Sequence, residues 1–293
     1  MLISMVQLLR PAQWSKNLLI FLPLFFSGQL LNVDLLLRSI VAFFAFSFAA
    51  SSIYCFNDIV DIKADRLHPK KCKRPIASGA VSPETGYLIM AVFVVLSIAT
   101  FFFFGGASYF ELMGLVTFYY LMNLAYCIRL KRYVIVDVII ISIGFVLRII
   151  VGGVATGIWL SEWLIMMTFL LALFLTFAKR RDDVILYINT GVPPRETTNR
   201  YNLEFANQLI TLIATITVIA YIMDTLSPDV MARFNSHYVY LTSIFVLVGI
   251  IRYLQITIVY LKSGNPTKIF LHDRFIQACI IGWVITFIII IYL

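Results

Sequence analysis

Long apolar runs recur along the whole chain, and they restrict its fold more than any other feature. Hydrophobic residues make up 61% of the 293 residues and charged residues only 13%, whereas soluble domains are about half apolar and about a quarter charged. Runs of about 20 apolar residues cross a hydrocarbon core of about 30 Å as α-helices. The sequence therefore predicts an all-α integral membrane protein. We expect nine transmembrane helices, at residues 17–31, 38–56, 84–104, 108–127, 134–156, 160–178, 205–224, 237–260 and 271–292.

Only short connections separate these spans, so we expect one transmembrane domain over residues 1–293. Of the 23 lysines and arginines, eighteen lie in the N-terminal arm or in the connections after the second, fourth, sixth and eighth spans. Arg38 and Arg233 fall on the other side, and Arg148, Arg252 and Arg274 lie within spans. Because cytoplasmic loops are enriched in positive charge, this asymmetry predicts a multi-pass protein of the cytoplasmic (inner) cell membrane, with a cytoplasmic N-terminus and a C-terminus on the opposite side. The net charge of +8 suits the anionic lipids of a bilayer and gives no indication of nucleic-acid binding.

A short acidic stretch interrupts the apolar pattern. Asp58, Asp61 and Asp65 fall within eight positions, although the whole chain has only 15 acidic residues. Spacings of three and four residues place these carboxylates on one face of a helix. Such a face is unfavourable unless a cation binds it, and Mg²⁺ prefers oxygen ligands and leaves positions for substrate phosphates. The stretch predicts an enzyme that handles a diphosphate, with three catalytic aspartates, of which Asp58 and Asp61 bind Mg²⁺.

Charged and polar residues within the predicted spans give a second group of candidates. Arg148 lies well inside the fifth span, where a charge costs about 2.5–3.5 kcal/mol on insertion scales, so we expect it to face an anion or a carboxylate. Asp137 precedes it by three helical turns and either lines the same face or pairs with another helix. Tyr119, Asn123 and Tyr126 form a polar stripe on the fourth span, which either contacts a sugar or satisfies neighbouring helices.

Two sets of motifs resemble those of a known family. The pattern Asn-Asp-x-x-Asp-x-x-x-Asp from Asn57 to Asp65 resembles the first acidic motif of the UbiA-type membrane prenyltransferase superfamily. That resemblance implies nine helices around a central cavity, with Mg²⁺ and a diphosphate at its cytoplasmic mouth. Four further segments resemble the decaprenyl-phosphate phosphoribosyltransferase branch of that superfamily. They are Arg10-Pro11-x-Gln13-Trp14-x-Lys16-Asn17, Arg148-x-x-x-Gly152-Gly153, Ala178-Lys179-Arg180 and Asp273-Arg274.

The branch implies transfer of 5-phosphoribose from phosphoribosyl diphosphate to a polyprenyl phosphate of the decaprenyl type, with release of pyrophosphate, for arabinose-containing cell-envelope polymers. Typical prenyl-diphosphate enzymes of the superfamily carry a second motif, commonly Asp-x-x-x-Asp, after the sixth span. Here the segment reads Lys179-Arg180-Arg181-Asp182-Asp183, and its adjacent carboxylates point in different directions on a helix. The three cations suit a donor with phosphates at both ends, or they are ordinary cytoplasmic charge.

The candidate substrate-binding residues lie in the motifs, beside the acidic stretch and within the spans. Lys70, Lys73 and Arg74 can position an anion by charge and hydrogen bonding. The whole set is Lys16, Asn57, Lys70, Lys73, Arg74, Tyr119, Asn123, Tyr126, Lys131, Asp137, Arg148, Lys179 and Arg180.

Two other functions remain open from the sequence. A prenyltransferase would move a prenyl group from its diphosphate to an aromatic or other acceptor, and the missing Asp-x-x-x-Asp motif counts against it. A transporter could surround a path with nine spans, but the chain has no clear internal repeat of the kind that transporters often show. Small-residue patches, such as the glycine pair at 152–153, permit close helix approach within one chain or in a homo-oligomer.

Overall fold

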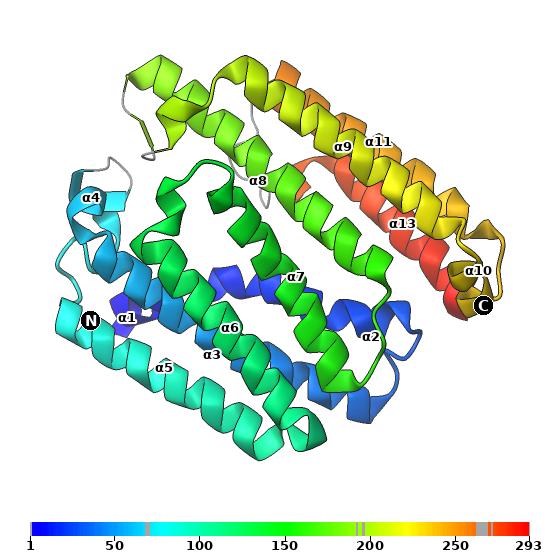
Figure 1. Ribbon diagram of the computed structural model, residues 1–293, viewed down its shortest axis with the longest axis horizontal. Helices are drawn as coiled ribbons and strands as arrows, with labels where there is room; N and C mark the ends of the chain where they lie inside the picture. The colour runs from blue at the N-terminus through cyan, green and yellow to red at the C-terminus, as the bar shows by residue number, and fades with distance from the viewer. Residues whose placement is uncertain are drawn as a thin grey trace. The chain divides into compact units, whose positions relative to one another are not determined.

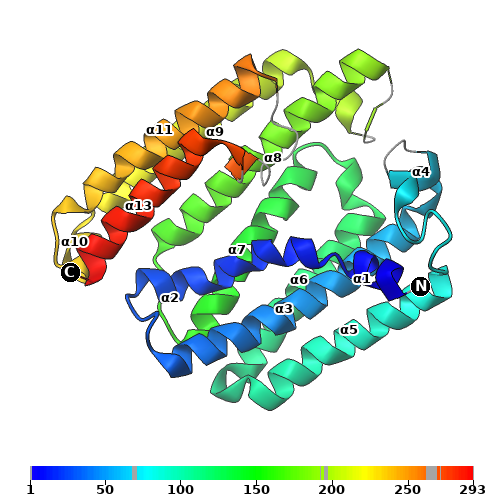
Figure 2. The same cartoon turned by 180° about the vertical axis from the view of Figure 1, so that it is seen from behind.

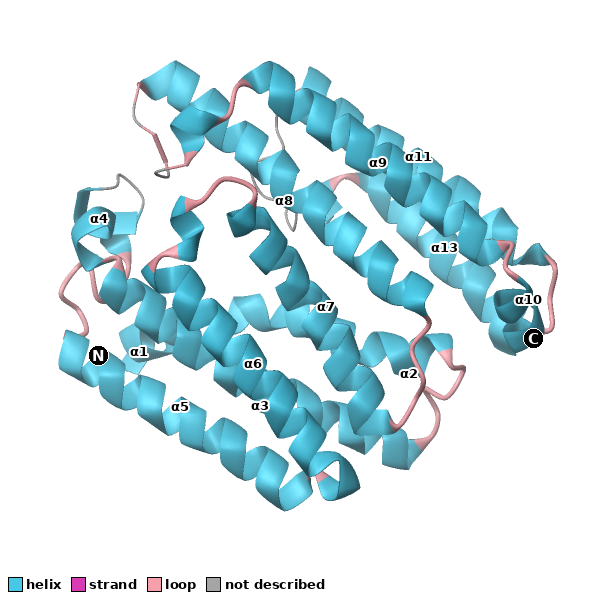
Figure 3. Cartoon of the chain, in the orientation of Figure 1, coloured by secondary structure: helices cyan, strands magenta, loops and turns pink. Residues whose placement is uncertain are grey.

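The computed structural model consists of helices and their connections. It describes residues 2–67, 71–191, 193–194, 197–261, 269–270 and 272–292. These residues form α-, 3₁₀- and π-helices and no β-strand, so the predicted all-α class is confirmed for them (Figure 3). The chain divides into two compact units, Met1–Leu160 and Ser161–Leu293.

The first unit combines four long helices with shorter segments. Its elements are α1 (Leu2–Leu9), η1 (Pro11–Phe21), α2 (Leu22–Phe26), α3 (Val33–Val60), α4 (Ile62–Leu67), η2 (Lys71–Lys73), α5 (Pro83–Phe104), η3 (Gly106–Ser108), α6 (Tyr109–Ile128), η4 (Leu130–Arg132) and α7 (Val136–Thr156). The long helix α3 packs along α5 and also contacts α6, α7 and η1 (Figure 1). In its core, Phe46 of α3 packs against Tyr119 of α6, with ring centroids 4.4 Å apart. The helix α3 therefore forms the centre of this unit.

The N-terminal segment, residues 9–26, differs from the predicted first span at 17–31. The chain instead forms the 3₁₀-helix η1, which begins at Pro11, and then the short helix α2, which ends at Phe26. Proline is favoured in the first turn of a helix and is unfavourable in its interior, and a proline stands in the first turn of each of these two elements. Figure 2 shows the segment running along α3 and α7, which η1 contacts.

Close approach between η1 and α7 depends on Gly152. A Cβ atom added at this position would lie 2.9 Å from the carbonyl carbon of Ile20 and would overlap its oxygen. Only glycine leaves room for backbone at such a distance. The close approach expected for the glycine pair at 152–153 is thus confirmed, and at Gly152 it occurs within one chain.

The second unit is built from long helices that pack in pairs. Its elements are α8 (Glu162–Thr190), η5 (Thr198–Arg200), α9 (Leu203–Thr225), α10 (Pro228–Phe234), η6 (Tyr238–Thr242), α11 (Ser243–Leu254), the π-helix η7 (Gln255–Val259) and α13 (Arg274–Tyr292). The helix α8 packs on α9, and α11 packs on α13 and α9 (Figure 1). Ser161 and Asn202 cap α8 and α9, accepting backbone hydrogen bonds from the third residue of each helix.

In the described residues, seven helices are long and apolar enough to cross a membrane, and a shorter apolar helix covers Arg274–Ile290. They correspond to eight of the predicted spans, so the protein is a multi-pass membrane protein. The count of nine and the single domain remain predictions. The largest difference in bounds concerns the span predicted at 160–178, because α8 continues to Thr190 and ends at Gly191 with a φ of 69°. No glycine or proline occurs between 179 and 190 to end this helix earlier.

Candidate functional site

The acidic stretch lies where α3 ends and α4 begins. The helix α3 ends at Val60, and Asp61 adopts φ −88° and ψ 4° before α4 starts at Ile62. Backbone hydrogen bonds continue across this break. The amide of Asp61 donates to the carbonyl of Asn57 at 3.0 Å, and the amide of Asp65 donates to the carbonyl of Asp61 at 2.8 Å. The helical spacing of the three aspartates is therefore nearly kept.

Two of the three carboxylates share one arginine. Arg74 donates from Nη1 to Oδ1 of Asp58 at 3.1 Å and to Oδ2 of Asp65 at 2.6 Å. Arg10 donates from Nη2 to the same oxygen of Asp58 at 2.5 Å. The side chains of Asp58 and Asp65 are 1% and 3% exposed, whereas those of Arg10 and Arg74 are each 25% exposed. The buried acids thus lie beneath partly exposed cations, which offset the repulsion between the acids.

The connection that carries Arg74 is itself fixed to α4. Arg66 donates from Nε to the carbonyl of Ala77 at 3.2 Å, and the amide of Ser78 donates to the carbonyl of Arg74 at 2.9 Å. Ile76 is buried against the apolar cluster formed with α1 and α3. These contacts hold the Arg74 backbone over the acidic stretch.

Asp61 has a different partner. Lys131 of η4 donates from Nζ to Oδ1 of Asp61, whose side chain is 26% exposed. Cys127, one turn before Lys131, contacts Oδ1 of Asn57 through Sγ at 3.4 Å. The structure therefore groups Asp58 and Asp65 on one arginine, and it pairs Asp61 with Lys131 of η4.

The donor chemistry of this site fits a divalent cation. No group of three His, Cys, Asp or Glu side chains in the described ranges is arranged to hold a metal ion. Asp58, however, has a buried Oδ2 atom that no group in the described part of the chain hydrogen-bonds. An unpaired buried carboxylate oxygen is unfavourable, and Mg²⁺ is commonly held by one or two carboxylates together with substrate phosphates. Asp58 could hold such an ion through this oxygen, and Asp61 is the more exposed carboxylate of the stretch.

Arg10 is a site residue that the sequence reasoning does not single out. Its backbone is left-handed, with φ 52° and ψ 58°, a conformation that is uncommon outside glycine. Strained backbone positions of this kind cluster at functional sites. The guanidinium group that binds Asp58 also lies over the ring of Tyr54, 5.2 Å from its centroid. In the sequence, only its place in the Arg10-Pro11 motif marks this residue.

Hydrogen bonds tie the N-terminal segment to one face of α3. The indole of Trp14 donates to Oγ of Ser51 at 3.0 Å, and the amide of Asn17 donates to Oγ of Ser47 at 2.8 Å. The two serines are four residues apart and therefore lie on one side of the helix. Arg10 of the N-terminal segment contacts the same side of α3 at Asp58, near the C-terminal end of that helix. The segment thus delivers Arg10 to the acidic stretch.

Arg148 anchors the same segment from α7. It donates from Nε to Oδ1 of Asn17 at 2.7 Å, from Nη1 to the carbonyl of Gly144, and from Nη2 to the hydroxyl of Tyr119 at 3.4 Å. Its guanidinium carbon lies 4.9 Å from the centroid of the Phe46 ring. Within the described residues, its hydrogen-bond acceptors are thus neutral groups instead of the anion or carboxylate that we expected. The two motifs that contain Asn17 and Arg148 contact each other directly.

The polar stripe on α6 is partly satisfied by its own helix. Asn123 donates its side-chain amide to the carbonyl of Tyr119 at 2.8 Å, and the Tyr119 hydroxyl accepts from Arg148. Tyr126 is half-buried. Tyr119 and Asn123 therefore have structural partners, as one of the two sequence interpretations allows.

Three other predicted residues of the first unit lie on three different elements. Asp137 is buried in the first turn of α7. Lys16 is half-buried on η1 and Lys73 is exposed on η2. Lys70 lies outside the described residues.

In the second unit, the predicted donor-binding cations lie within α8 and not in a connection after it. Lys179 is exposed. Arg180 is buried and donates from Nη1 to Oδ2 of Asp183 at 3.2 Å.

Arg181, the next residue of α8, joins three elements of the second unit. It donates from Nε to Oδ1 of Asn207 on α9 and from Nη1 to the carbonyl of Thr257, each at 2.6 Å. Thr257 lies in the π-helix η7, where backbone hydrogen bonds follow an unusual i→i+5 pattern. These contacts give Arg181 a structural role.

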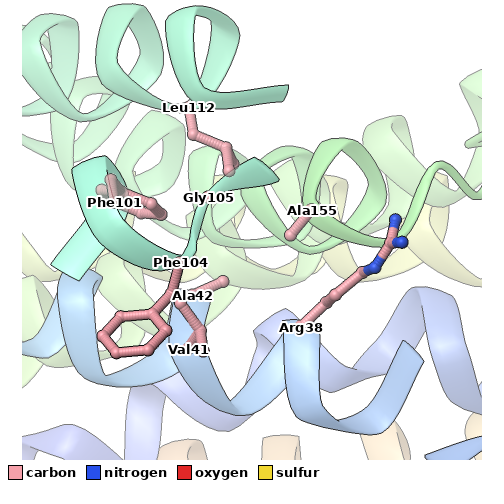
Figure 4. A pocket seen from close by; sticks show the side chains of 8 residues that line it. All are labelled: Arg38, Val41, Ala42, Phe101, Phe104, Gly105, Leu112 and Ala155. Atoms are coloured by element: carbon pink, nitrogen blue, oxygen red, sulfur yellow. The ribbon is translucent and has the colours of Figure 1, made fainter. Parts of the chain in front are cut away.

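The pocket drawn in Figure 4 lies at the opposite end of α3 from the acidic stretch. It is bounded by the beginning of α3, the end of α5 and the end of α7, with Arg38 and Phe104 in its wall. Its volume is about 10 Å³, which is room for about one water molecule. It is therefore too small for a substrate.

The chain is similar to known proteins over most of its length. Residues 18–276 match the UbiA prenyltransferase family. The decaprenyl-phosphate phosphoribosyltransferase of Mycobacterium tuberculosis is 33% identical over 288 residues, which are 97% of this chain and 92% of that protein. The enzyme of the same name from Mycolicibacterium smegmatis is 32% identical over 291 residues, covering 96% of this chain and 90% of that protein.

A solved structure shares the fold. A UbiA homologue from Archaeoglobus fulgidus, determined with DMAPP and Mg²⁺, superposes with a TM-score of 0.71 at 20% identity. The match covers 97% of this chain and 99% of that chain. By its sequence match over most of its length and by its fold, the chain belongs to the UbiA prenyltransferase family.

Proposed function

We propose that this protein transfers 5-phosphoribose from phosphoribosyl diphosphate to a polyprenyl phosphate of the decaprenyl type. The observation that carries the proposal is the surroundings of Asp58, a buried acid with an unpaired oxygen that is flanked by Arg10 and Arg74. Carboxylate oxygens suit the metal of a metal–diphosphate complex, and guanidinium groups suit phosphate oxygens. The names of the relatives at 33% and 32% identity support this choice of donor and acceptor.

The residues of the first unit have complementary roles in this proposal. Asp58 and Asp61 hold Mg²⁺, and Asp65 orients Arg74 through their hydrogen bond of 2.6 Å. Arg10, Arg74 and Lys131 bind oxygens of the diphosphate by charge-assisted hydrogen bonds. When bound, Mg²⁺ supplies neutralising charge for the departing pyrophosphate.

The proposed reaction is a glycosyl transfer. The bond between the anomeric carbon and the pyrophosphate oxygen breaks, and pyrophosphate leaves with the bonding electron pair. A bond forms between that carbon and an oxygen of the polyprenyl phosphate. The sugar carries oxocarbenium character in the transition state, as in glycosidases. A phosphate monoester with a second pKa of about 6 is largely ionised at neutral pH, so the site needs no strong general base.

The proposed donor also implies a side of the membrane. Phosphoribosyl diphosphate is soluble and highly charged and does not cross hydrocarbon, so the acidic stretch opens to the cytoplasm in this proposal. We would replace Cys72 and Cys279 by serine and introduce Ser78→Cys or Ser236→Cys. We expect a membrane-impermeant thiol reagent to label Ser236→Cys on intact cells and Ser78→Cys only after permeabilisation. Labelling of Ser78→Cys on intact cells would contradict this orientation.

The decisive experiment compares two donor classes on purified protein. With phosphoribosyl diphosphate, Mg²⁺ and a polyprenyl phosphate, we expect lipid-linked phosphoribose and pyrophosphate in equal amounts. A parallel reaction with a prenyl diphosphate and aromatic acceptors should give no product. Product from the prenyl donor alone would refute the proposal in favour of a prenyltransferase.

A further inference from the structure

Tyr54 lies within the candidate site, and neither the motifs nor the ion pairs account for it. It precedes Asp58 by four residues on α3, so the two side chains project from one face of the helix, about 6 Å apart along its axis. The same face carries Ser51, three residues earlier, which binds Trp14 of the N-terminal segment. The ring of Tyr54 lies under the guanidinium group of Arg10 at 5.2 Å. The position of the Tyr54 ring next to Asp58 is therefore set by the contact with Arg10 and by the binding of Trp14 to Ser51 on the same helix face.

The hydroxyl group of Tyr54 is open to a ligand. Within the described residues it has no hydrogen-bond partner, and its side chain is half-buried instead of enclosed. Its electrostatic neighbours are Tyr119, Arg148 and Arg10. The polar groups of Arg148 and Tyr119 are already engaged with each other and with Asn17. A bound molecule can therefore supply a hydrogen bond to this phenol.

We propose that the Tyr54 hydroxyl hydrogen-bonds a ribose hydroxyl of the donor and so selects a pentose donor. This inference rests on the proposed phosphoribosyl transfer and names one determinant of its specificity. The charged groups around Asp58 match the diphosphate, whereas a neutral phenol one helical turn away both donates and accepts, as a sugar hydroxyl does. A prenyl chain offers no partner to this hydroxyl, and an unpaired polar group in a site disfavours the substrate that leaves it unpaired.

The test is the variant Tyr54→Phe, which keeps the ring beneath Arg10 and removes only the hydroxyl. Tyr109→Phe, at the far end of α6, is the matched control. Both are assayed with phosphoribosyl diphosphate and with its 2-deoxy and 3-deoxy analogues, at saturating polyprenyl phosphate. Loss of one neutral hydrogen bond should raise the donor KM of Tyr54→Phe about three- to tenfold, with the acceptor KM unchanged.

The analogues identify the contact. For the wild type, the KM of one deoxy analogue should exceed that of the full donor by the same factor. For Tyr54→Phe, the KM values of that analogue and of the full donor should be equal. The reason is that the tyrosine change and the deoxy change remove the same hydrogen bond. A donor KM within twofold of wild type, or equal losses with all three donors, would overturn the inference. Absence of turnover by the wild type would instead refute the proposed function itself.

Discussion

Replacing Gly152 by alanine should detach the N-terminal segment from α7. The added Cβ would lie 2.9 Å from the carbonyl carbon of Ile20. The Cβ position at Gly152 and the carbonyl of Ile20 are both fixed by the backbone, so no side-chain rotation relieves the overlap. The helices α7 and η1 must therefore separate. Overpacking of this kind costs about 1–3 kcal/mol. Because η1 carries Arg10 to Asp58 and Asn17 to Arg148, we also expect a higher KM for the phosphoribosyl donor.

The assay is the thermal midpoint of purified protein, with Gly114→Ala as the control. A Cβ at Gly114 meets nothing within 4 Å, so this variant should keep or gain stability, since alanine is favoured over glycine in helices by about 1 kcal/mol. For chains of this size, 1 kcal/mol corresponds to a shift of about 2–4 °C. An equal or higher midpoint for Gly152→Ala than for wild type would refute the reasoning.

Four further variants test individual residues of the protein. Asp58→Asn and Asp61→Asn should each abolish turnover with little change in thermal midpoint, and a chelator should mimic them until Mg²⁺ is restored; near-normal activity of both would exclude the metal assignment. Lys131→Gln should raise the donor KM about ten- to hundredfold, the scale of one charge-assisted hydrogen bond, whereas equal effects on donor and acceptor would indicate general damage. A hydrogen bond from Arg252 holds the pKa of Asp273 below its usual range. The pair therefore stabilises the fold above the ordinary Asp pKa of about 3.9, and this stabilisation is lost as the pH falls below that value. Arg252→Gln should therefore lower the thermal midpoint at pH 7 and leave it closer to wild type at pH 3, and the same shift at both values would contradict the pairing.

The long apolar helices were predictable because their length is dictated by the bilayer and not by tertiary contacts. Predicted spans such as 84–104 and 134–156 agree with α5 and α7 within two residues. The C-terminal end of α8 was not predictable from the sequence, because charged residues end an apolar run without ending a helix. The helix continues through Arg180 and Arg181 until Gly191 supplies a left-handed residue.

The candidate site was predictable in part, because carboxylates at helical spacing stand out in an apolar chain. Arg10 did not stand out, since its contact with Asp58 spans 48 residues and depends on a left-handed backbone that no local pattern specifies. Arg148 was expected to meet a negative charge, and it meets Asn17 instead, 131 residues away. Pairings at such separations follow from the packing of the N-terminal segment on α3 and α7, which the sequence does not display.

The 3₁₀ geometry of η1 gives the N-terminal segment both its reach and its sidedness. Three residues per turn align side chains three apart, so Trp14, Asn17 and Ile20 form one straight row towards α3 and α7, while Ala12, Ser15 and Leu18 form an exposed row. In an α-helix the same row would turn by about 60° at each step. The 11 residues of η1 and the 5 of α2 also rise by about 30 Å, at about 2.0 and 1.5 Å per residue. Inserting one residue into η1 would turn every later contact by about 120°.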